Sequence, residues 1–274
     1  MSGPTLTPLG VDADAYEPVL AKQHESASWQ RFSGYRFATG RGAVPIAASE
    51  VESCAVEFPL IIEREGGSYR LLSLFAIDRM TNLFVTREGR WRGAYIPAAL
   101  RAYPFSAISR NGSSTLAIEQ AAVDRAGEYG DEAFFVDGRL TELLTQVAEF
   151  IARLDQGVRE LSEHLSDLAH LAVLEPLDRP DIAALSENPT LMVSDSALRA
   201  LPATDLRNLA QSGALNVAYA QSLSMHNLQY LRRLDRSAAR PAAATNRRAE
   251  SASSTNPPDD EFLLAVRQDY ERNT

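Results

Sequence analysis

The hydrophobic positions change their period near the middle of the chain. Before residue 140, apolar and β-branched residues form short runs separated by turns that contain glycine, as in 58–63 and 69–77 around Gly66-Gly67. Two such runs around a glycine turn predict a β-hairpin. A second hairpin is predicted over 82–96, where aromatic and branched residues suit a pleated surface, and 115–119 is a further strand candidate. The first half is therefore predicted to be rich in strands.

From Leu140 onward the apolar residues recur every three or four positions, which predicts one long amphipathic helix. The stripe comprises Leu140, Leu143, Leu144, Val147, Phe150, Ile151, Leu154, Val158, Leu161, Leu165 and Leu168. We expect Gly157 to weaken or bend the helix, and Glu175-Pro176 to end it. The stripe is expected to pack against the sheet or another helix. Because the repeat is close to 3.5, a coiled-coil homodimer through 140–171 is the alternative.

The following segment is predicted to be mainly helical. A short strand at 190–193 precedes three predicted helices, which end near residues 201, 213 and 234. The fold class is therefore predicted to be α+β. A mostly antiparallel, β-rich N-terminal half packs with the long amphipathic helix and a helical C-terminal part. We expect one domain over residues 1–234.

The composition changes again after residue 234. Residues 235–260 are dominated by Ala, Ser, Thr, Pro, Asn and Arg, and such a segment is predicted to be a disordered linker. Residues 261–274 carry apolar side chains at roughly helical spacing, which predicts a short amphipathic tail helix. Those side chains are Phe262, Leu263, Val266 and Tyr270. A helix beyond a linker is a candidate for docking to a protein partner, and a frayed tail without a role is the alternative.

Composition and charge narrow the classes of function. The 274 residues carry a formal net charge of -9, which argues against a nucleic acid as partner. The single cysteine, Cys54, excludes an intramolecular disulfide and is expected to be a buried apolar residue. The first residues lack a secretory signal pattern, and no apolar run is long enough to span a membrane. We therefore expect a soluble cytoplasmic protein, with non-classical export to the surface as the alternative.

The common catalytic and metal-binding signatures are missing. The chain has a single lysine, Lys22, and no P-loop sequence, and Gly40-Arg41-Gly42 lacks the third glycine of a dinucleotide turn. No HExxH zinc motif or GxSxG nucleophile elbow occurs. His164 and His170 lie about 9 Å apart along the predicted helix, too far for one metal ion to bridge unaided. We predict no catalytic residue, no metal and no cofactor, and an enzyme is the less favoured interpretation.

Several short motifs are informative in combination. They are Tyr16-Glu17-Pro18-Val19 with His24, Val44-Pro45-Ile46 with Glu50, Phe58-Pro59-Leu60, Asn82-Leu83-Phe84-Val85, Gly89-Arg90-Trp91, Tyr95-Ile96-Pro97, Arg101-Ala102-Tyr103-Pro104-Phe105, Phe134-Phe135-Val136-Asp137-Gly138, Leu174-Glu175-Pro176-Leu177 and Asn227-Leu228-Gln229. Together they resemble the bacterial SapC family over about residues 15–234. The family is named for a component of surface-layer formation, and differs from the peptide-transport permease of the same name. The resemblance implies an accessory, binding or assembly protein of the cell envelope, without an identifiable reaction.

Aromatic and polar residues near the proline turns are candidates for a ligand or peptide groove. They are His24, Trp91, Tyr95, Arg101, Tyr103 and Phe105. Ordinary core packing is the alternative for these side chains. A groove would favour an enzyme, or an enzyme subunit, that acts on a peptide or a small aromatic substrate. The resemblance suggests a tryptophan-halogenase-like protein as its partner in that case.

Overall fold

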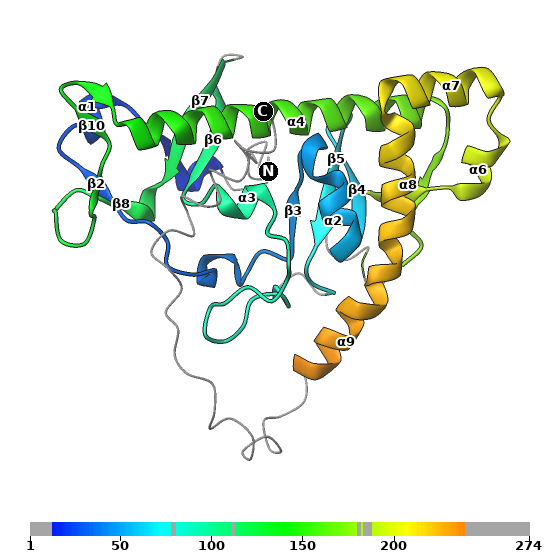
Figure 1. Cartoon of the computed structure of the whole chain (residues 1–274), viewed down its shortest axis with the longest axis horizontal. Coiled ribbons are helices and arrows are strands. Elements are labelled where there is room, and N and C mark those ends of the chain that lie inside the picture. Colours follow the sequence, from blue (N-terminus) through cyan, green and yellow to red (C-terminus); the bar gives the residue numbers. More distant parts are fainter. Residues whose placement is uncertain (1–12, 78–80, 111–112, 180–181, 183–187, 239–274) are drawn as a thin grey trace.

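The computed structural model describes residues 13–77, 81–110, 113–179, 182 and 188–238 (Figure 1). Antiparallel sheets alternate with short helices in the first half, and helices dominate the second half, which confirms the predicted α+β class. The last described helix, α9 (Leu228–Ala238), extends into the predicted linker. The division into a domain over 1–234, a linker over 235–260 and a tail over 261–274 stays a prediction. Most of the linker and the whole tail lie outside the described residues.

The largest sheet has the strand order β12-β13-β4-β5-β3. Its centre is the hairpin of β4 (Leu60–Glu65) and β5 (Ser68–Leu74), which confirms the first hairpin prediction. Gly66 and Gly67 form the turn with φ of 56° and 95°, a left-handed backbone that glycine adopts most readily. The outer strands are β3 (Ala43–Pro45), β13 (Thr190–Val193) and β12 (Leu174–Pro176).

Three smaller sheets make up the other part of the strand structure. One has the order β1-β7-β6, formed by Tyr16–Pro18, Ser113–Glu119 and Phe105–Arg110. Another has the order β8-β2-β9, formed by Val123–Asp124, Ser28–Trp29 and Glu132–Ala133. The third pairs β10 (Phe135–Val136) with β11 (Arg139–Leu140).

The second predicted hairpin forms only in part, through backbone hydrogen bonds from Thr86 N–H to Arg90 O and from Arg92 N–H to Phe84 O. Over 82–96 the described chain forms turns, with one isolated bridge between Val85 and Trp91. The backbone N–H groups of Ala94 and Tyr95 donate to the Glu57 carboxylate instead of to a neighbouring strand. A remote side chain therefore takes the hydrogen bonds that a strand ladder would need.

The long helix α4 (Glu142–His170) runs along the long axis of the molecule and packs against β5 of the largest sheet and β6 of the β1-β7-β6 sheet (Figure 1). Thr141 caps it, because its Oγ1 accepts a hydrogen bond from the backbone N–H of Leu144. The buried stripe comprises Leu144, Val147, Phe150, Ile151, Leu154, Val158, Leu161, Leu165 and Leu168. Leu140, which we expected in this helix, lies in β11 and is 37% exposed. The stripe packs inside the chain, so a coiled coil through it would have to expose the core.

Gly157 permits a close approach rather than a bend. A Cβ atom added at Gly157 would lie 2.8 Å from the Cβ of Ala47, just before the 3-10 helix η3 (Ala48–Glu50). The helix also ends earlier than expected, at His170, and Ala172 with φ of 54° turns the chain into β12. Glu175-Pro176 therefore lies in a strand and does not terminate the helix.

The C-terminal helices form one flank of the molecule. They are α6 (Asp195–Ala200), α7 (Ala203–Ser212), α8 (Ala214–Ser224) and α9, with the 3-10 turn η5 (Met225–Asn227) dividing α8 from α9. Gln221 of α8 donates to the carbonyl of Leu60 (3.0 Å) and accepts from the N–H of Val193 (2.9 Å), so it joins β4 to β13. None of the helices in the described ranges is long and apolar enough to cross a membrane.

Candidate functional site

A buried carboxylate, Glu50, lies at the centre of a polar cluster that contains two of the predicted groove residues. Its side chain is 3% exposed and sits between η3 and the helix α2 (Val51–Glu57). It accepts hydrogen bonds from the Tyr95 hydroxyl (2.8 Å) and from the backbone N–H groups of Ala98 (2.6 Å) and Ala47 (3.1 Å). The Arg101 guanidinium lies 4.0 Å away. Tyr95 and Arg101, two of the predicted groove residues, are thus brought together.

A second carboxylate of α2 fixes the same segment from its other side. Glu57 accepts hydrogen bonds from the backbone N–H groups of Ala94 and Tyr95, both at 2.7 Å. The indole N–H of Trp91 donates to the Tyr95 carbonyl at 2.8 Å. A Cβ atom at Gly93 would lie 2.4 Å from Glu57 Oε1, so a side chain there would displace this contact. Residues 91–97 are therefore clamped by two glutamates and one indole.

The polar and charged groups of this cluster have hydrogen-bond partners within the protein. Burial raises the pKa of Glu50, although Arg101 and the backbone donors act in the opposite direction. Burial and the neighbouring Glu50 raise the pKa of Tyr95. Arg101 donates from Nε to the Ile96 carbonyl (3.0 Å) and lies over the Phe150 ring (5.5 Å). These groups form hydrogen bonds with one another. The cluster therefore stabilises residues 91–101 rather than presenting a reactive group.

The lone cysteine lies beside this cluster. Cys54 is 0% exposed, which confirms its expected place in the core. Burial, with Glu50 nearby, raises the pKa of its thiol well above the ordinary value. A thiol with a raised pKa holds little of the nucleophilic thiolate. Cys54 is therefore a packing residue.

Tyr103, the fourth predicted groove residue, belongs to a half-exposed aromatic group. Its ring stacks on Phe37 at 3.8 Å, and the Arg41 guanidinium lies over both rings at 5.3 and 5.7 Å. Burial and a hydrogen bond to Glu119 raise the pKa of the Tyr103 hydroxyl. The predicted groove residues did not include Phe37, Arg41 or Phe32, the last of which packs edge-on against Tyr103. The alternation of aromatic and arginine residues over 31–41 was the available signal.

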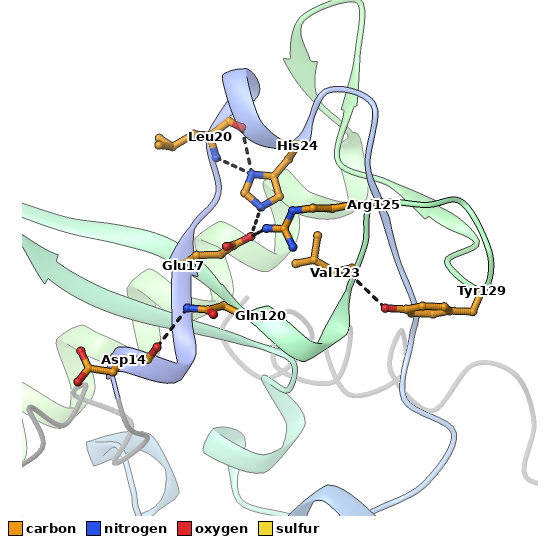
Figure 2. A network of polar contacts seen from close by, with 8 residues as sticks. All are labelled: Asp14, Glu17, Leu20, His24, Gln120, Val123, Arg125 and Tyr129. Carbon is orange, nitrogen blue, oxygen red and sulfur yellow. Dashed lines mark hydrogen bonds and ion pairs between the residues drawn. The ribbon is translucent and has the colours of Figure 1, made fainter.

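His24 is buried in a separate polar network (Figure 2). It ends the helix α1 (Ala21–His24), and its Nε2 lies 2.9 Å from Glu17 Oε1 while its Nδ1 lies 3.1 Å from the Leu20 carbonyl. Arg125 reaches the same Glu17 oxygen, and Figure 2 shows both side chains converging on it. The imidazole also contacts the Phe134 ring at 4.7 Å. The network ties β1 and α1 to the loop after β8.

The sixth predicted groove residue, Phe105, is a core residue. It is 2% exposed and packs edge-on against Trp29 at 4.8 Å. His24 and Phe105 border the core beneath the N-terminal part of α4, whereas Trp91 and Tyr95 contact the core of the large sheet. Trp91 is connected to the Tyr103 group, because Tyr35 contacts both Trp91 (5.8 Å) and Phe37 (6.0 Å), whereas His24 and Phe105 contact the other core.

Two open cavities border α9, and neither is lined by any of the six residues. One, of about 590 Å³, is lined by Ile77, Gln229, Arg232, Arg233, Asp235 and Arg236. The other, of about 260 Å³, is lined by Arg179, Met225, His226, Leu228, Gln229 and Arg232. Within the described ranges, no group of three or more His, Cys, Asp or Glu side chains is placed to hold a metal ion. The six-residue groove stays a prediction.

The predicted docking residues of the tail cannot be placed. Phe262, Leu263, Val266 and Tyr270 lie outside the described residues. Their role as a docking element stays a prediction from the sequence.

The comparison with protein families assigns most of the described fold to one family. The SapC family profile matches residues 20–231, from the start of α1 into α9. The chain belongs to the SapC family. No curated protein and no solved structure matches it. The SapC match covers the Glu50 cluster, the Tyr103 group and most of the His24 network, and it stops before Arg233, Arg236 and the tail.

Proposed function

We propose that this SapC protein is a non-catalytic binding component of the cell envelope or surface layer, and that it engages a protein partner through α2 and α8. The observation that carries the proposal is the exposure of large apolar side chains on these helices. Val56 is 82% exposed, Tyr219 52% and Leu223 66%. Large apolar side chains that gather on a protein surface are typical of interaction sites.

The two helices that carry these residues are neighbours in the fold. α2 packs against α8 (Figure 1), and the Asn227 side chain donates to the Ala55 carbonyl at 2.8 Å. α8 carries no charged residue. Its inner side is buried through Val217 and Ala218, while Tyr219 and Leu223 leave its outer side apolar as well. Asn216 is exposed as well, but two large exposed apolar side chains on an uncharged helix support a protein partner on the outer side.

The chemistry of the interior supports a binding role over the enzyme alternative. The Glu50 carboxylate is occupied by three donors from its own chain, and the Tyr95 hydroxyl is one of them. Catalytic groups need access to a substrate atom within hydrogen-bond reach. The placement in the envelope rests on the family name, and the protein partner on the apolar flank.

Site-specific photo-crosslinking in the native cell tests the proposal. A photoreactive amino acid at Tyr219 is expected to give one discrete adduct, of different mass from a dimer, in the envelope fraction. Leu223→Lys should abolish this adduct because it places a charge in the apolar contact. Gln211→Lys, at an exposed position of α7, is the matched control and should retain it.

Two outcomes would contradict the proposal. An adduct with twice the mass of the chain would identify a second copy as the occupant of this flank. A chain that gives no adduct, although Leu223→Lys and the parent chain show the same circular dichroism, has no stable partner at α8.

A further inference from the structure

The α9 groove is the pair of cavities that border α9, and it is lined by several arginines. The larger cavity contains Arg232, Arg233 and Arg236, and the smaller one adds Arg179 and shares Arg232. Figure 1 shows α9 at the lower end of α8, at the periphery of the molecule. The larger volume, about 590 Å³, lies within the range of pockets that hold ligands or side chains.

The charge of the α9 groove opposes that of the whole chain. Four arginines meet at the groove, whereas the formal net charge of the chain is -9. Among the described lining residues of the two cavities, Asp235 is the acidic one. Among the described residues, Arg179, Arg233 and Arg236 form no ion pair with a carboxylate, and Arg236 Nε donates to the carbonyl of Arg232 at 3.3 Å. Several positive charges that line one groove favour an anionic occupant.

The same chain contains a segment with the matching chemistry. Residues 259–272 carry five carboxylates, against two arginines. The carboxylates are Asp259, Asp260, Glu261, Asp269 and Glu271. Phe262 and Leu263 follow the first three directly, so acidic and apolar groups are adjacent in the sequence. The larger cavity offers the complementary groups, a positive charge and an apolar surface, because it is lined by Ile77 as well as by arginines.

The length of the intervening chain allows the segment to reach this groove. α9 ends at Ala238, and residues 239–258 separate it from Asp259. A flexible chain of twenty residues would span about 25 Å on average, compared with about 16 Å for the eleven residues of α9. A tether of this length gives an effective concentration of about 1 mM. Binding within one chain is therefore favoured over binding between chains at micromolar protein.

We infer that residues 259–272 dock onto the α9 groove of their own chain. The acidic residues at 259–261 bind Arg233 and Arg236, and Phe262 packs against Ile77. A docked segment covers the groove, so any other anionic ligand has to displace it. The inference concerns α9 alone and does not depend on the partner proposed for α2 and α8.

Hydrogen–deuterium exchange of the full chain measures the docking directly. At low salt, the amides of 260–271 should exchange more slowly than in a free peptide of the same sequence. An effective concentration of about 1 mM and a dissociation constant of about 0.1 mM predict roughly tenfold slower exchange. At 1 M salt the protection should fall, since the screening length is only about 3 Å.

Charge reversals identify the contacts. Arg233→Glu with Arg236→Glu should remove the protection of 260–271. Arg153→Glu with Arg207→Glu, at exposed positions of α4 and α7, is the matched control and should retain it. Charge reversal in the segment alone, by Asp259→Lys, Asp260→Lys and Glu261→Lys, leaves α9 unchanged. It should also remove the exchange protection of 260–271. Combining this reversal with the α9 reversal should restore at least half of the protection.

Three results would overturn the inference. The first is exchange of 260–271 equal to that of the free peptide. The second is protection that survives both charge reversals. The third is protection that rises between 1 and 100 µM protein together with a dimer mass in sedimentation, because the groove would then bind the segment of a second copy. Protection that is independent of concentration in a monomer supports docking within the chain.

Discussion

Replacement of Glu50 by alanine should cost a large part of the stability of the fold. The substitution leaves the Tyr95 hydroxyl and the N–H groups of Ala47 and Ala98 without their acceptor, at a site where Glu50 is 3% exposed. Each buried donor without a partner costs about 1–3 kcal/mol. The raised pKa of Glu50 shows that burial of its charge is itself unfavourable, which offsets part of this loss. We therefore expect Glu50→Ala to lower the free energy of unfolding by about 3–4 kcal/mol.

Urea denaturation of the full chain, followed by circular dichroism, measures this loss. Glu52→Ala, at an exposed position of α2, is the matched control and should change the free energy of unfolding by about 0.5 kcal/mol or less. Tyr95→Phe removes only the hydroxyl that donates to Glu50. A double-mutant cycle between Glu50→Ala and Tyr95→Phe should give a coupling energy of about 1–2 kcal/mol.

Two results would refute this reasoning. A loss below about 1 kcal/mol for Glu50→Ala would mean that the three donors find other partners or water. Additive effects in the double-mutant cycle would mean that Glu50 and Tyr95 act independently, despite their 2.8 Å contact.

Three further substitutions test other parts of the fold. Gln221→Leu removes the side chain that joins β4 to β13 and should lower the free energy of unfolding, measured in urea, by about 2–4 kcal/mol. Gly157→Ala gains about 1 kcal/mol of helix propensity but places a Cβ 2.8 Å from that of Ala47, so a net loss of about 1–2 kcal/mol is expected in the same assay. Four backbone N–H groups lower the pKa of Asp124, so its contribution to stability is present above the ordinary aspartate value and is lost as the pH falls through the folded-state pKa. Asp124→Asn should therefore flatten the acid limb of the stability curve, and an unchanged acid limb would contradict this.

The elements that the sequence predicted well are those whose pattern is local. The period of α4 persists from residue 144 to 168, and each buried position lies on one stripe. The hairpin of β4 and β5 follows from two apolar runs around Gly66-Gly67. In both cases the residues that decide the structure lie within a few positions of one another, so the pattern is visible in one dimension.

The failures have non-local causes. The 82–96 segment contains good strand residues, but the Glu57 carboxylate, 37 and 38 positions away from Ala94 and Tyr95, takes their N–H groups. The strand propensities of residues 82–96 give no indication of that contact. Gly157 was expected to weaken α4 because propensity considers one helix alone, whereas its neighbour Ala47 explains the glycine. Glycine, which is unfavourable within a helix, is therefore explained by the contact of Gly157 with Ala47 in the folded chain.

The candidate site shows the same division. Aromatic and polar residues near the prolines were recognised, and Tyr95 and Arg101 do meet. Their shared partner Glu50 comes from more than 40 positions earlier, so the spacing within 91–105 could not reveal it. His24 was recognised as unusual, but its role depends on Glu17 and Arg125, and only the fold brings Arg125 to it.

The helix α4 supports the 91–101 segment at two separate places, which explains why the Glu50 cluster is rigidly positioned. Gly157 lets α4 approach Ala47, whose N–H binds Glu50, and Glu50 in turn holds Tyr95 and Ala98. Two turns earlier in α4, Phe150 lies beneath the Arg101 guanidinium. The core helix therefore fixes both ends of the segment. A segment that is held by an apolar stripe, the buried Glu50 and the partly buried Glu57 has little freedom for a ligand-driven movement. Partner binding is consequently expected at the exposed apolar side chains of α2 and α8, and docking of the acidic segment 259–272 at α9.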